Sequence, residues 1–147
     1  ISRKHLELVF LQERLGRNET AISRYQFDCL THLRHLQDTL RAIRYAVQIL
    51  TDWAGDSPIP GAAVAIQIAF RSQELAILLK QPRHFHASVV VESTRQLLVF
   101  LGRFHELLHA EKPAPAVAYW RNELEPALRE TDDWTQQAID NLRAELG

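Results

Sequence analysis

The residues best suited to chemistry lie together near the middle of the chain, where the sequence reads His105-Glu106-Leu107-Leu108-His109. On a helix, two histidines four residues apart project from one face and can share a zinc ion. The glutamate between them can activate a zinc-bound water. This spacing would therefore support hydrolysis by a metal-activated water.

Over these five residues the chain resembles the zincin metallopeptidases. The resemblance implies a third zinc ligand downstream and a β-sheet along whose edge the substrate binds. Glu123 and Glu125 follow the motif rather closely, and the remaining candidate, Glu130, lies in no familiar motif. The residues flanking the motif are charged, unlike those of most zincins. We therefore expect that His105, His109 and Glu130 form no metal site and that the chain carries no cofactor.

The other reactive side chains have structural interpretations. Cys29 occupies an apolar position in a helical pattern and is expected to be a small buried hydrophobe. His32 and His35 share one helix face beside that pattern, whereas His84 and His86 precede a helix, where loop or capping roles are favoured over ligation. The sequence has no Gly-rich phosphate loop, nucleophile elbow or Cys-x-x-Cys. We therefore predict no catalytic residues.

The elements that would position these residues all have helical patterns. Between residues 22 and 50, apolar side chains recur every three or four residues over about four heptads. Gly16 is expected to end a short helix before this one, and Asn18 to cap the long one. The sequence predicts helices at 3–15, 19–53, 62–80, 85–111 and 116–146.

The third of these helices is ambiguous, since parts of it alternate as a strand would. Ala63, Ile66, Phe70 and Ile77 also fit a helical stripe, and nothing else in the chain offers a partner strand. A helix is therefore preferred. The segment Ala54–Gly61, which is rich in Gly, Pro, Asp and Ser, is expected to be the loop before it.

The fold class that follows is all-α: a bundle of four long helices plus a short N-terminal one, with the last helix kinked at Pro126. Gly102, in the middle of a helix, is expected to mark a close approach between helices. The acidic C-terminal segment is expected to lie beside the Arg-bearing second helix, with a basic partner as the alternative. The predicted core comprises Leu33, Leu36, Leu40, Ile43, Val47, Leu97, Leu101, Phe104, Leu108, Leu124 and Trp134.

Composition limits the class of protein. The 147 residues are 46% hydrophobic and 24% charged, which is typical of one globular domain, and the net charge of -1 gives no reason to expect a nucleic-acid partner. No apolar run approaches the length of a membrane span. One cysteine excludes an internal disulfide and leaves the compartment open, with the cytoplasm favoured. The absence of Met suggests a fragment of a larger protein, and the excess of Arg over Lys suggests a bacterial one.

Three functions remain after this reading. The leading one is a non-enzymatic interaction or regulatory domain, as in the soluble part of a bacterial membrane transporter or sensor. The second is a small-molecule sensor whose ligand lies among Trp53, Trp120 and Trp134, and the third is a zinc hydrolase that uses the H-E-x-x-H motif. The expected partner is a protein, with a homodimer favoured, because the second helix is longer than the third helix can cover.

Overall fold

The computed structural model describes residues 3–51, 61–109 and 113–146. Its elements are α1 (Arg3–Thr51), α2 (Gly61–Leu78), the 3-10 turn η1 (Pro82–Phe85), α3 (Ser88–His109), α4 (Pro113–Tyr119), the π-helical segment η2 (Trp120–Leu124) and α5 (Glu125–Leu146). None of the described residues lies in a β-strand. The predicted all-α bundle of four long helices with a kinked last helix is confirmed.

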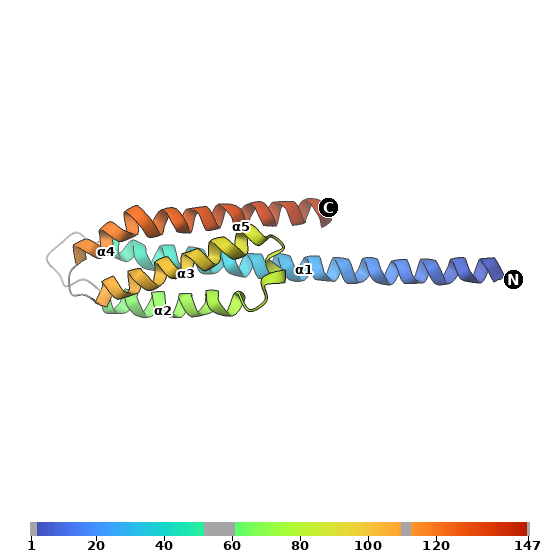
Figure 1. Cartoon of the computed structure of the whole chain (residues 1–147), viewed down its shortest axis with the longest axis horizontal. Helices are drawn as coiled ribbons and strands as arrows, with labels where there is room; N and C mark the ends of the chain where they lie inside the picture. The colour runs from blue at the N-terminus through green and yellow to red at the C-terminus, as the bar shows by residue number, and fades with distance from the viewer. Residues whose placement is uncertain (1–2, 52–60, 110–112, 147) are drawn as a thin grey trace.

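The helices pack as a square in which each one touches its two neighbours in the order α1, α2, α3, α5 and back to α1 (Figure 1). The first and last long helices of the chain, α1 and α5, are therefore neighbours. The Gln26 side chain donates a hydrogen bond to Glu145 at 3.0 Å, and Gln37 donates one to Gln136 at 2.7 Å. The acidic C-terminal segment thus lies beside α1, as the preferred interpretation of the sequence expected.

The core of the bundle is formed by the predicted seam residues. Leucine, isoleucine and valine side chains of α1 pack against those of α3 and α5, with almost no exposure to solvent. Two of the predicted residues, Leu108 and Trp134, are only partly buried and pack at the edge of the core. The residues confirmed in the core are Leu33, Leu36, Leu40, Ile43, Val47, Leu97, Leu101, Phe104 and Leu124.

The boundary predicted at Gly16 is wrong, because α1 is helical without interruption from Arg3 to Thr51. One glycine inside a helix costs only about 1 kcal/mol relative to alanine, and neither a proline nor a change of helical phase accompanies it here. The N-terminal part of α1 projects beyond the bundle as a single helix (Figure 1). The predicted end of this helix at Trp53 and the loop 54–60 lie outside the described residues.

Two further boundaries shift at the start of α3 and in the last helix. Phe85 belongs to η1 and not to α3, which begins at Ser88. In the last helix the kink is a π-helical segment, in which the backbone N–H of Glu125 donates to the carbonyl of Trp120. Pro126 follows directly, and the wider π turn accommodates a residue that has no N–H to donate. The prediction of one helix bent near Pro126 is confirmed.

Gly102 does not mark a close helix contact, so that prediction is wrong. A Cβ atom built on this residue would meet nothing within 4 Å, and the residue is exposed on α3. Within the described helices, no stretch is both long and apolar enough to cross a membrane.

Candidate interaction surface

The H-E-x-x-H motif lies on α3 with its two imidazoles in contact. The Nε2 atoms of His105 and His109 are 3.3 Å apart, and the ring centroids are 4.5 Å apart. Two nitrogen ligands of a tetrahedral zinc ion also lie about 3.3 Å apart, so the separation suits a shared proton and a shared metal equally. Glu106 lies on a different face, where it forms an ion pair with Arg103 at 3.2 Å.

A zinc site also needs a third protein ligand. Among the described residues, no group of three His, Cys, Asp or Glu side chains could hold a metal ion. Glu130, the candidate named from the sequence, is exposed on α5 and lines a shallow hollow with Pro126, Asp133 and Trp134. The structure therefore brings His105 and His109 together but does not place Glu130 or Glu106 in one group with them.

The histidines of the α2–α3 connection form a second cluster, at the opposite end of the bundle. The ring of His32 on α1 stands edge-on to Phe85, with centroids 4.7 Å apart, and also contacts His84. The Tyr25 hydroxyl donates to the carbonyl of Arg83 at 2.6 Å. These contacts hold the connection against α1 and place the fully buried Phe85 in the core.

The electrostatics of this cluster suit structure and not catalysis. Burial lowers the pKa of His32, as does the nearby His84, so the neutral ring is favoured. Burial also raises the pKa of the Cys29 thiol, which disfavours the nucleophilic thiolate. His86 lies in the left-handed region at φ 60° and forms an ion pair with Glu145 at 3.5 Å. The predicted loop and capping roles of His84 and His86 agree with this geometry.

The feature that sequence analysis missed is the outer face of α2. The helix prediction is confirmed, but its core face consists of Val64, Ala65, Ile68, Leu75 and Leu78. The stripe identified from the sequence faces solvent instead: Ile66 is 68%, Phe70 53% and Ile77 55% exposed. With Ala63 and Gln73, which are also exposed, these residues form a straight row opposite the core, which we call the α2 outer seam.

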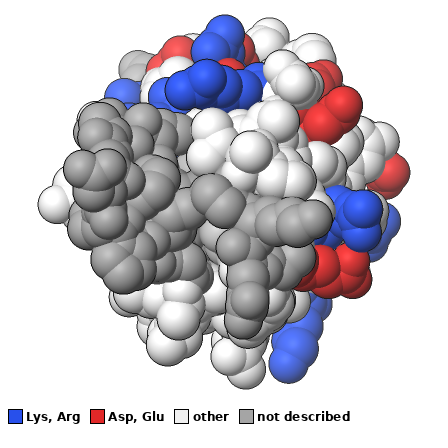
Figure 2. Space-filling view, turned by 90° about the vertical axis from the view of Figure 1, so that its left-hand side faces the viewer, with Lys and Arg blue, Asp and Glu red and all other residues white. Residues whose placement is uncertain are grey.

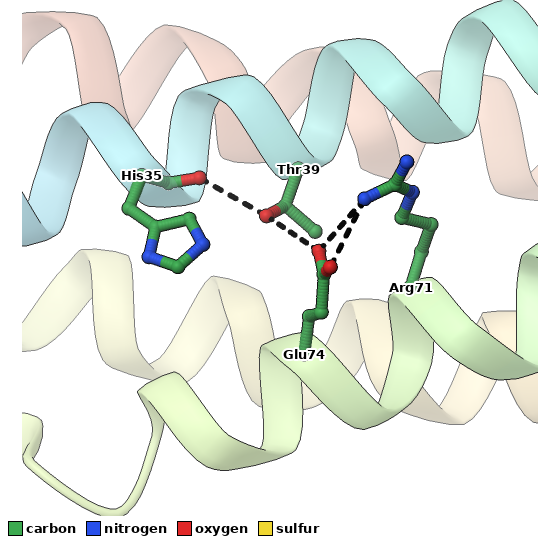
Figure 3. A network of polar contacts seen from close by, with 4 residues as sticks. All are labelled: His35, Thr39, Arg71 and Glu74. Atoms are coloured by element: carbon green, nitrogen blue, oxygen red, sulfur yellow. Dashed lines mark hydrogen bonds and ion pairs between the residues drawn. The ribbon is translucent and has the colours of Figure 1, made fainter.

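The α2 outer seam carries no charge. The only charged residues of α2 are Arg71 and Glu74, and both turn towards α1 (Figure 3). Arg71 donates to both carboxylate oxygens of Glu74, at 3.0 and 3.1 Å, and the Thr39 hydroxyl lies 3.2 Å from the same carboxylate. The guanidinium group also lies over the ring of Phe70, 5.1 Å from its centroid. The two charges thus compensate each other at the α1–α2 contact.

Beside this seam lies a hollow of about 420 Å³ between α1 and α2. Small side chains form much of its lining, and one charged residue takes part: the lining residues are Ala42, Tyr45, Ala46, Ala63, Val64, Gln67 and Arg71. Tyr45 is 74% exposed. The hollow is large enough for an aliphatic or aromatic side chain and shares Ala63 with the seam.

The end of the bundle and the outer face of α3 carry a mixture of charged and apolar residues. Figure 2 looks onto the end of the bundle at which α2 begins and α3 ends, and the basic and acidic side chains visible there are interspersed. On α3 the exposed Val99 has charged residues of both signs on the same outer face, namely Glu92, Arg95, Arg103 and Glu106. Single exposed apolar residues of this kind are normal, whereas a continuous row is not.

The two tryptophans among the described residues, Trp120 and Trp134, occupy different places in the bundle. Trp120 is buried against Phe104, with ring centroids 6.3 Å apart, and Trp134 is at the edge of the core. Trp53 lies outside the described residues. Comparison with protein-family models, with curated proteins and with solved structures finds no significant match to this chain.

Proposed function

We propose that this chain is a non-enzymatic interaction domain in which the α2 outer seam is the surface that docks against a partner helix. The single observation that carries the proposal is the exposure of Ile66, Phe70 and Ile77 in one row. A surface helix normally has a polar face opposite its core face, and a helix that is apolar all round is normally buried. A partner that packs on this row would bury the apolar side chains that α2 exposes.

The spacing of the seam favours a helix as the partner. Ile66, Phe70, Gln73 and Ile77 follow each other at intervals of four, three and four, which is the a/d pattern of a coiled coil. None of the seam residues is charged, and the neighbouring Arg71 is paired with Glu74, which suits the centre of an interface, where charged residues are depleted. The adjoining hollow provides a place for one anchoring side chain.

The proposal is tested by photo-crosslinking in the organism that encodes the protein. A benzophenone amino acid replaces Phe70 in one variant and Val99 in the other; Val99 is the matched control, because it is an exposed apolar residue on a charged face. We expect a covalent protein adduct from position 70, lost when Ile66→Glu is added, and none from position 99. No adduct from position 70, or equal adducts from both, would contradict the proposed function.

A further inference from the structure

We infer that the partner of the α2 outer seam is a second copy of this chain, with the two α2 helices antiparallel about a twofold axis. This inference rests on the proposed function and names the occupant of the same surface. Antiparallel twofold packing requires a face that is complementary to itself. Three properties of the α2 face meet this requirement.

The first property is the symmetry of the seam. The intervals of four, three and four read the same in both directions along α2. In an antiparallel pair, Ile66 therefore lies opposite Ile77 of the second copy, and Phe70 lies opposite Gln73 of that copy. Each contact occurs twice, so these four seam side chains are covered in both copies, and Ala63 lies outside the symmetric part of the seam.

The second property is a matching knob and hollow. The hollow between α1 and α2 is lined by Ala63 and Gln67, and so lies at the level of Ile66 along α2. The antiparallel register brings Ile77 of the second copy to that level. Ile77 is 55% exposed and lies about two helical turns beyond Phe70 along the seam. One copy thus offers the side chain that the hollow of the other can hold.

The third property is the charge and shape of the flanks. Ala62, Ala69 and Ala76 are exposed along one side of the seam, and such small side chains allow two helices to approach closely. Gln67 and Gln73 each offer both a donor and an acceptor, so an identical residue can pair with either. Because Arg71 and Glu74 compensate each other, a twofold pair brings no uncompensated like charges together.

The size of the face sets the expected strength of the dimer. The 18 residues of α2 span about 27 Å, and one helix flanked by Tyr45 is smaller than the roughly 800 Å² per partner of a standard stable interface. We therefore expect a reversible dimer that depends on concentration, with dissociation in roughly the micromolar to submillimolar range.

Sedimentation equilibrium of the 147-residue chain, from roughly 10 µM to 1 mM, tests the inference. The native chain should convert from monomer to dimer over this range. Ile66→Glu should weaken the dimer at least about tenfold, because it places a carboxylate against Ile77 of the second copy. The matched control Val99→Glu should leave the dimer unchanged. Far-UV circular dichroism should show native helix content in every variant.

A charge-pair rescue tests the antiparallel register. In the double variant Ile66→Glu with Ile77→Lys, the antiparallel pair gains two Glu–Lys contacts, so dimerisation should recover relative to Ile66→Glu alone. A parallel pair would place like charges opposite each other and would not recover. Absence of rescue, or equal loss of dimer in Val99→Glu, overturns the inference. A chain that stays monomeric at every concentration also overturns it, whereas a crosslink from position 70 to a different protein would leave the proposed function standing.

Discussion

The ring of His32 on α1 stands edge-on against the ring of Phe85 in η1, with centroids 4.7 Å apart. This contact joins the first helix of the bundle to the connection between α2 and α3. The Nε2 atom of His32 is buried without a hydrogen-bond partner among the described residues. The folded protein therefore favours a neutral imidazole here.

The first prediction concerns acid stability. Burial and the neighbouring His84 lower the pKa of His32 from its ordinary 6.5, so the unfolded chain takes up the proton at a higher pH than the folded one. Stability is then full above pH 6.5 and falls as the pH drops from 6.5 towards the lowered pKa. Chemical denaturation at a series of pH values should show this slope. It should be reduced in His32→Gln and retained in the control His109→Gln, and equal slopes in the two variants would refute the assignment.

The second prediction concerns the H-E-x-x-H motif. Because no third ligand accompanies His105 and His109 among the described residues, we expect purified protein to hold no stoichiometric zinc. His105→Ala and His109→Ala should each change the free energy of unfolding by no more than about 1–2 kcal/mol. Metal analysis by mass spectrometry checks this directly. Zinc at one equivalent that disappears in His109→Ala would instead bring forward the hydrolase alternative.

The third prediction concerns Gly102. Since a Cβ atom there would meet nothing within 4 Å, Gly102→Ala should raise the free energy of unfolding by about 0.5–1 kcal/mol. The gain comes from the lower backbone entropy that alanine has in the unfolded chain. Gln96→Gly, at another exposed position of α3, is the reverse control and should lower stability by a similar amount. A loss in Gly102→Ala would mean that a contact requires the glycine.

The fourth prediction concerns Pro126. The π-helical segment before it already accommodates the missing N–H, so proline is tolerated here and is not required for the bend to form. Pro126→Ala should leave the free energy of unfolding unchanged or raise it, as measured by urea denaturation. A loss of several kcal/mol would show that Pro126 instead opens a separate helix.

Much of the fold could be predicted because α1 has one apolar row and α3 has another. The residues from Leu33 to Val47 recur in a single phase, so their burial followed from periodicity alone. In α2 the same reasoning failed, because both Ile68 and Phe70 belong to apolar rows on opposite sides of one helix. Local spacing does not decide which row faces the core; the packing of α1 and α3 does. The absence of charged residues from most of α2 was the available signal of a second apolar face.

The candidate site was predictable only in part. The contact between His105 and His109 follows from their separation of four residues on a helix. That no third ligand lies near them among the described residues depends on how α3 packs in the bundle, which the motif does not encode. The contact of His32 with Phe85 was likewise beyond sequence reasoning, because the turn η1 brings together residues 53 positions apart.

The order of neighbours around the bundle also governs how the chain can fold. Among the four long helices, the contacts of α1 with α2, of α2 with α3 and of α3 with α5 join helices that follow one another along the chain. The contact of α1 with α5 joins the first long helix to the last. Chains dominated by local contacts fold on the order of microseconds to milliseconds, because little loop entropy is lost before contacts form. The contact of α1 with α5 includes the hydrogen bond from Gln26 to Glu145. Of the contacts between the long helices, this one closes the longest segment of chain. Packing α5 against α1 is therefore the step of folding that loses the most loop entropy.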